Sequence, residues 1–205
     1  DSYSGSSDYG NYPDNELSAQ LSIISRMVKG NLGTKVYLVQ LDGFDTHSNQ
    51  LEDHEILIKQ LSETISHFYD DLANAGWDDK VLSMTTSEFG RRVSENCSGG
   101  TGHGKASMAM FFGTPLNGNG FVGTHPDLSD LDGGNLKYTT DFRELYASVL
   151  KEWLCVNPAL VNEVLLGKKY DPLDLGFNCS GDITLGIDVD SIEKSIFKHY
   201  VNYND

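Results

Sequence analysis

KVYLVQLDGFDTH, residues 35–47, is the stretch that decides the predicted fold. Its first part is apolar, β-branched or aromatic at most positions and contains no Gly or Pro. Such a run is typical of a strand buried on both faces of a parallel sheet. Gly43 ends the expected strand. Asp42, Asp45 and His47 lie at its carboxyl end, where open α/β sheets bind their ligands. These side chains suit a divalent metal, and an ordinary turn is the alternative.

Helical patterns flank this expected strand. Asn15 is a suitable N-cap for a helix that ends at Gly30, and apolar residues at steps of three and four predict a second, longer helix over 51–75. Two more apolar runs are predicted strands, at 80–86 and 106–112, and further helices are expected at 141–154 and 158–166. Helices and strands that alternate with short connections indicate the α/β class.

A second polar turn, SEFGRR at 87–92, directly follows the predicted strand 80–86. Glu88 is suited there to ligate a metal or to act as a base, or alternatively to form a salt bridge with Arg91 or Arg92. Arg91 is suited to bind an anionic group with both arms of its guanidinium. Glu88 and Arg91 are therefore the candidate catalytic residues.

A third site candidate is the glycine-rich stretch SGGTGHGK, residues 98–105, with His103 in its middle. Flexible backbone around one histidine suits close approach to a ligand or a metal. The stretch is similar to a phosphate-binding loop, but Ala106 stands where that loop needs a hydroxyl residue. Nucleotide hydrolysis of that class is therefore excluded.

The composition narrows the classes of partner. The chain has 30 acidic and 15 basic residues and a net charge of −15, which disfavours nucleic acid because phosphate contacts need clustered Lys and Arg. No apolar run is long enough for a transmembrane helix. Residues 1–13 are rich in Ser, Gly, Tyr and Asp and are expected to form a flexible segment.

The three cysteines contain no CxxC pair, so a structural zinc site is not expected. An odd number allows one disulfide and one free thiol, and Cys155–Cys179 is a candidate pair that the sequence leaves open. Asn96 and Asn178 each begin an N-x-S sequon, which matters only in a eukaryotic secretory pathway.

The motifs GFDTH, SEFGR and GHG occur in this order, and TTDFRELYASVLKEWL follows at 139–154. Together they resemble the bacterial family called domain of unknown function 1501, over about residues 12–174. That family is placed in the alkaline phosphatase and sulfatase superfamily. The resemblance implies a three-layer α/β/α sandwich with a mostly parallel sheet. The expected organisation is a flexible segment at 1–13, a sulfatase-like domain at 14–174 and a C-terminal extension at 175–205.

The resemblance also implies a metal centre at the strand ends. Its expected ligands come from all three loops and are Asp42, Asp45, His47, Glu88 and His103. Zinc, calcium, magnesium and manganese remain open as the metal. Two residues depart from the superfamily pattern: Phe89 replaces a histidine ligand and Gly102 replaces an aspartate. The chain resembles the C-terminal portion of such a protein, so the fold is expected to be incomplete and to lack the half with the nucleophile.

The expected function is metal-dependent hydrolysis of a small anionic phosphate or sulfate ester, in a secreted or periplasmic domain. The alternative is a catalytically inactive extracellular module whose partner is another protein chain, in a surface assembly or filament. An assembly with a missing N-terminal part, or with further copies of itself, fits either expectation.

Overall fold

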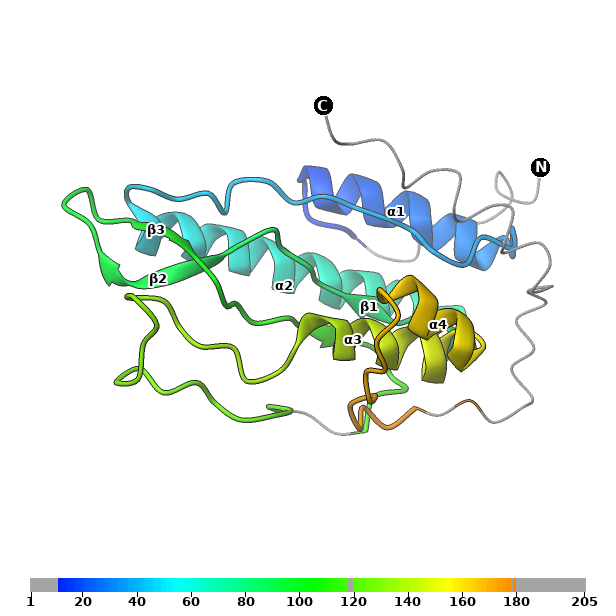
Figure 1. Cartoon of the computed structure of the whole chain (residues 1–205). Coiled ribbons are helices and arrows are strands. Elements are labelled where there is room, and N and C mark those ends of the chain that lie inside the picture. The colour runs from blue at the N-terminus through cyan, green and yellow to red at the C-terminus, as the bar shows by residue number, and fades with distance from the viewer. Residues whose placement is uncertain (1–10, 118–119, 178, 180–205) are drawn as a thin grey trace, which may run out of the picture. The chain divides into compact units, whose positions relative to one another are not determined.

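The computed structural model describes residues 11–117, 120–177 and 179. These residues belong to two compact units, Asp1–Thr139 and Thr140–Asp205, which we describe separately. The elements of the first unit are, in order, α1 (Glu16–Lys29), α2 (Gln50–Asn74), the 3-10 helix η2 (Asp78–Lys80), β1 (Ser83–Met84), β2 (Gly90–Glu95), β3 (Thr101–Gly104) and β4 (Phe111–Phe112). The second unit contains α3 (Phe142–Ser148), the π-helix η3 (Val149–Trp153) and α4 (Pro158–Val164) (Figure 1).

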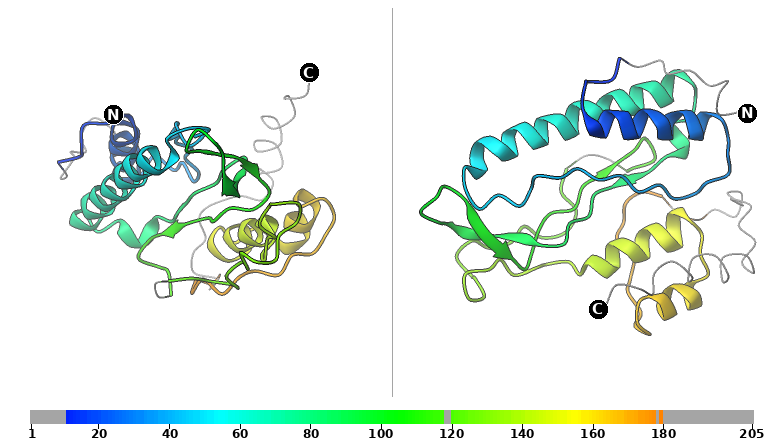
Figure 2. Two further views of the ribbon diagram at one scale, coloured as in Figure 1. Left: turned by 90° about the vertical axis from the view of Figure 1, so that its left-hand side faces the viewer. Right: turned by 90° about the horizontal axis from the view of Figure 1, so that it is seen from above.

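The first unit is built around the packing of α1 against α2, which lie side by side in every view (Figures 1 and 2). Leu17 and Leu21 of α1 and Phe68 and Leu72 of α2 are buried in one cluster. These residues lie on the helical faces that the apolar periodicity predicts. The predicted caps are also confirmed, because Asn15 accepts a hydrogen bond from the Ser18 amide and Gly30 ends α1.

A buried ion pair lies between the same two helices. The Asp71 side chain of α2 is fully buried, and its Oδ1 accepts a hydrogen bond from Nζ of Lys29 at 2.8 Å. Its Oδ2 accepts hydrogen bonds from the hydroxyls of Ser25, at 2.5 Å, and Tyr12, at 3.0 Å. A buried carboxylate is tolerated only with such partners, so this network fixes how α1 sits on α2.

The prediction of a mostly parallel three-layer α/β/α sandwich is wrong. Among the described residues, the strands form two separate antiparallel pairs, β1 with β4 and β2 with β3. Residues 80–86 and 106–112 contribute only the short pair Ser83–Met84 and Phe111–Phe112. The turn SEFGRR and the glycine-rich stretch, predicted as loops, instead supply most of the β2–β3 hairpin, in which Arg91 pairs with His103.

Residues 35–41 do not form the predicted central strand. They are assigned to no strand, and their side chains alternate: Val39 and Leu41 pack on the α1–α2 core, whereas Val36 and Leu38 are 69% and 84% exposed. The Gln20 side chain of α1 makes the two hydrogen bonds that a neighbouring strand would make with Gln40. Its Oε1 accepts from the Gln40 amide, and its Nε2 donates to the Gln40 carbonyl. The prediction fails because α1 and α2 bury their apolar faces against each other, so this segment is covered on one side only.

The second unit has its own small core of Ala147, Val161 and Leu165. Asp141 caps α3 in a capping box with Glu144, and Pro158 begins α4, as the sequence indicates. The Phe142 side chain at the start of α3 is 64% exposed and lies outside this core. The helical run after α3 widens to the π-helix η3, which shifts the buried face away from the regular periodicity.

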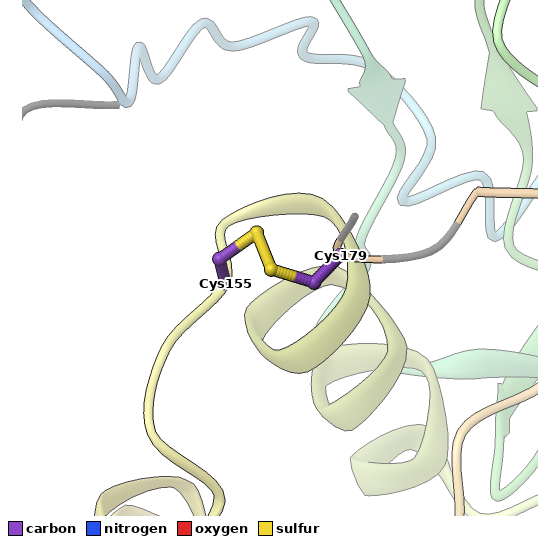
Figure 3. Close-up of a disulfide and its surroundings, with 2 residues drawn as sticks. All are labelled: Cys155 and Cys179. Atoms are coloured by element: carbon purple, nitrogen blue, oxygen red, sulfur yellow. A yellow bond between two sulfur atoms is a disulfide. The ribbon is translucent and has the colours of Figure 1, made fainter. Parts of the chain in front are cut away.

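A disulfide joins Cys155, which follows η3, to Cys179 (Figure 3). It realises the pairing that the sequence left open, and Cys97 is an exposed free thiol. Of the two asparagines that begin an N-x-S sequon, Asn178 lies outside the described residues.

Among the helices that the structure describes, none has the length and apolar composition needed to cross a bilayer.

Candidate metal centre

The candidate site is formed where the loop before α2 meets the β2–β3 hairpin. Asp45 and His47 lie on this loop, and His103 lies on β3. The loop is held against the hairpin by a β-bridge between Ser48 and Gly99 and by a 2.8 Å hydrogen bond from the Gln50 amide to the Gly99 carbonyl. Residues far apart in the sequence therefore meet at the N-terminal end of α2 (Figure 1).

One carboxylate oxygen is the centre of the site. Nε2 of His103 lies 2.8 Å from Oδ1 of Asp45, and Nε2 of His47 lies 3.0 Å from the same oxygen. Each of Asp45, His47 and His103 offers one atom that could bind a metal, and these three atoms all lie within 4.8 Å of one another. No other group of three or more His, Cys, Asp or Glu residues in the described part of the chain is arranged in this way. We call these three residues the Asp45 cluster. Their side chains are 58%, 55% and 47% exposed, so the cluster is open to solvent.

Arg91 of β2 holds Asp45 from the protein side. Its NH2 group donates to Oδ1 of Asp45 at 3.1 Å and to the Phe44 carbonyl, and its NH1 group donates to the Thr101 carbonyl at 2.8 Å. The side chain is only 14% exposed. The guanidinium is thus engaged with the protein, and its hydrogen bond to Oδ1 holds the Asp45 carboxylate in place.

These neighbours stabilise the ionised form of Asp45. The hydrogen bond from His103 is the largest cause that lowers the Asp45 pKa below its ordinary value of 3.8. The charges of His47 and His103 and the hydrogen bond from Arg91 act in the same direction, whereas burial opposes them. The carboxylate is therefore ready to act as a ligand at neutral pH.

The rings of the cluster are stacked. The His103 ring lies on the Phe89 ring with a centroid distance of 3.7 Å and an interplanar angle of 6°. The His47 ring is stacked on His103 at 5.0 Å and 27°. Phe89 thus contacts the cluster directly.

Asn96 fixes the backbone behind His47. Its Nδ2 donates to the His47 carbonyl at 2.9 Å, and its Oδ1 accepts hydrogen bonds from the amides of Ser98 and Gly100. Gly100 allows this close approach, because a Cβ atom there would lie 2.2 Å from the carbonyl carbon of His47. The hairpin and the loop therefore meet backbone to backbone.

Two predicted ligands lie apart from the cluster. Asp42 accepts a hydrogen bond from the Gln40 side chain and lines an open pocket with residues of α1 and α2. Glu88 is exposed on the turn before β2 and is not part of the cluster, and the salt bridge considered between Glu88 and Arg91 is replaced by the pair of Arg91 with Asp45. The structure brings together three of the five predicted ligands.

The donor set of the Asp45 cluster fits a divalent transition metal. Two imidazole nitrogens and one carboxylate oxygen are ligands of zinc and its neighbours, whereas calcium and magnesium prefer oxygen ligands alone. Two atoms that each lie about 2.0–2.1 Å from one tetrahedral zinc ion are about 3.3 Å apart, so the separations of 2.8 and 3.0 Å would each widen by a few tenths of an ångström to admit the ion.

Sequence reasoning missed the supporting residues Phe89 and Asn96. The sequence indicates Phe89 as the replacement of a ligand and Asn96 as part of a sequon, because phenylalanine has no ligand atom and the asparagine amide ligates mainly hard cations such as calcium. The only available signal was position, since each lies next to a stretch that carries a candidate ligand.

Comparison with known proteins identifies the family. No curated protein and no solved structure matches the chain. The family model described as protein of unknown function (DUF1501) matches residues 6–165, more than half of the chain, and so confirms the family that the motifs indicate. The chain therefore belongs to the DUF1501 family of proteins of unknown function.

Proposed function

We propose that this chain is a metal-binding, hydrolase-like domain in which the Asp45 cluster holds one divalent transition metal ion. The observation that carries the proposal is the approach of two histidines, from separate segments of the chain, to a single oxygen of Asp45. An ordinary solvent-exposed turn is stable without two histidines from separate segments close to one carboxylate oxygen. The substrate class we propose is a small phosphate or sulfate ester, as the superfamily resemblance implies.

The arrangement supports a reactive metal site more than a closed structural one. Structural zinc sites have four protein ligands, whereas catalytic sites have three and leave a position for water or substrate. The Asp45 cluster offers three side chains and is half exposed. A bound ion there would supply Lewis-acid polarisation of an ester oxygen. Asp45 would contribute negative charge and Arg91 would orient it, while His47 and His103 would bind through Nε2.

The proposed location is secreted or periplasmic. The support for it is the disulfide between Cys155 and Cys179, because disulfides persist in oxidising compartments and are rare in the cytosol of mesophiles.

The first test is metal content and affinity. The purified chain, stripped with a chelator and reloaded with Zn²⁺, Mn²⁺, Mg²⁺ or Ca²⁺ in turn, is analysed by elemental mass spectrometry and titration calorimetry. We expect one Zn²⁺ per chain, which His47→Ala and His103→Ala each remove. His125→Ala is the matched control, since His125 bonds the Pro126 carbonyl and is outside the cluster.

Zinc binding that survives both cluster substitutions would overturn the site, and a chain that takes up none of the four metals would overturn the function. Hydrolysis of p-nitrophenyl phosphate and p-nitrophenyl sulfate by the loaded chain then tests the substrate class. An intact metal site without turnover of either ester would reject the hydrolase part of the proposal.

A second candidate is a catalytically inactive extracellular module in an assembly. The observation that favours it is the segment 35–41, which pairs with no described strand and exposes Val36 and Leu38. Open strand edges of this kind invite pairing with another chain. Size-exclusion chromatography with and without chelator separates the candidates. A large assembly that Val36→Lys/Leu38→Lys dissolves would favour the module, and a monomer with a metal-dependent esterase activity would reject it.

A further inference from the structure

We propose that Phe89 is a positioning residue of the metal site, which holds the His103 ring in the orientation that lets Nε2 act as a ligand. This inference rests on the proposed metal-binding function. It reverses the interpretation of Phe89 as the relic of a lost ligand.

The backbone of β3 fixes only part of the His103 side chain. The Cα position is set by pairing with Arg91 across the hairpin. The last torsion of a histidine, which turns the ring about its own axis, has broad and shallow preferences. Half of the side chain is exposed, so the strand alone leaves this ring free to turn.

In metal sites the second nitrogen of a ligand histidine is normally held by a hydrogen bond, which sets the ring plane. Among the described residues, the hydrogen bond of His103 runs from Nε2 to Asp45, and Nδ1 has no such partner. The usual restraint on a ligand ring is therefore not made here by a hydrogen bond within the described part of the chain.

Phe89 supplies this restraint by contact. Its ring lies parallel to the His103 ring, 6° apart in plane and 3.7 Å apart in centroid distance, which is direct face-to-face contact. A rotation of His103 about its last torsion would drive its edge into the Phe89 face. Arg91 contacts both the Phe89 ring and the Asp45 carboxylate. Its guanidinium carbon lies 5.2 Å from the centroid of the Phe89 ring, and its NH2 group donates a hydrogen bond to Asp45.

Phe89 has no ligand atom, so it changes the site only through the histidine. Loss of the ring is expected to weaken zinc binding by about tenfold, as is typical when an outer-shell partner of a ligand is removed. If Phe89 had only a structural role, loss of its ring would lower the stability of the fold. The Zn²⁺ affinity of the molecules that remain folded would then be unchanged.

The experiment compares Phe89→Leu, which removes the ring, with Phe89→Tyr, which keeps it. Phe121→Leu is the matched control, because Phe121 also packs on a histidine, His125, but outside the cluster. Zn²⁺ affinity is measured by calorimetry, the visible spectrum of the Co²⁺-loaded chain reports the ligand geometry, and thermal unfolding reports stability. In the metal-free chain, NMR follows the ring protons of His103, which the Phe89 ring current shifts upfield.

We expect Phe89→Leu to lower the Zn²⁺ affinity about tenfold and alter the Co²⁺ spectrum, with Phe89→Tyr and Phe121→Leu close to wild type. An unchanged affinity and spectrum in Phe89→Leu would overturn the inference while leaving the metal site in place. Absence of Zn²⁺ binding in the wild-type chain would overturn both proposals. The upfield shift of His103 would then still report whether the two rings are stacked.

Discussion

The buried ion pair of Lys29 and Asp71 offers the most direct test of how the first unit is held together. The Lys29→Met substitution removes the cation from a pair whose side chains are 5% and 0% exposed. Removing one partner of a buried pair costs about 3–5 kcal/mol, because a charge is left buried without compensation. We expect the lower end, near 3 kcal/mol, since the hydroxyls of Ser25 and Tyr12 still donate to Asp71.

The opposite substitution, Asp71→Leu, is expected to cost more. It leaves the Lys29 ammonium without its buried carboxylate and removes the acceptor of both hydroxyls, so about 5 kcal/mol is expected. The double variant Lys29→Met/Asp71→Leu removes both members of the buried pair. It is expected to be more stable than Asp71→Leu alone, by at least about 1 kcal/mol.

The assay is urea unfolding followed by tryptophan fluorescence in a Trp153→Phe background. Trp77, which packs against the α1–α2 core, then reports on the first unit alone. Lys59→Met is the matched control, because Lys59 and Glu63 form an ion pair whose side chains are 71% and 50% exposed. The control is expected to change the free energy of unfolding by less than about 0.5 kcal/mol.

Two results would refute the reasoning. Equal small losses for Lys29→Met and Lys59→Met would mean that burial does not set the value of the Lys29–Asp71 pair. A double variant that loses the full sum of the single losses would mean that the two side chains act independently.

Three further predictions concern other parts of the chain. Gly100→Ala places a Cβ 2.2 Å from the His47 carbonyl carbon, so the loop that carries His47 must shift. We expect the Zn²⁺ affinity measured by calorimetry to fall about tenfold. An unchanged affinity would show that the close contact at Gly100 does not hold His47 in place. Burial raises the pKa of Tyr69 above its ordinary value of 10.0, so the stabilisation by its neutral form is complete below about pH 10 and is lost as the pH rises through the folded-state pKa. Urea unfolding at increasing alkaline pH should therefore show a steeper loss in wild type than in Tyr69→Phe, and parallel curves would contradict the burial argument. Reduction of Cys155–Cys179, 24 residues apart in sequence, should lower the stability of the second unit by about 3 kcal/mol in thermal or urea unfolding, and Cys155→Ser/Cys179→Ser should match the reduced wild type but not respond to reductant.

Local signals in the sequence determined the helices. Asn15, Asp141 and Pro158 mark helix starts because capping and proline geometry depend only on neighbouring residues. The buried faces of α1 and α2 follow from periodicity for the same reason. The motif order also determined the family, which the family comparison confirms over residues 6–165.

The sequence identified part of the candidate site. The sequence singled out Asp45, His47 and His103 because their side chains are typical metal ligands, and these three meet in space. It also singled out Asp42 and Glu88 for the same reason, but membership of a site depends on distance. Asp42 lies by an open pocket beside α1 and α2, and Glu88 lies outside the cluster on the turn before β2.

Only the tertiary structure decided the strands and the supporting residues of the site. Whether an extended segment joins a sheet depends on which backbone reaches its open hydrogen-bonding groups, and local sequence does not contain that information. Residues 35–41 have the composition of a buried strand, yet the packing of α1 on α2 leaves them covered on one side. The stack of Phe89 on His103 depends likewise on the pairing of β2 with β3. The sequence by itself determined the helices, the family and the chemistry of the candidate ligands, and long-range packing determined which of these candidate ligands meet.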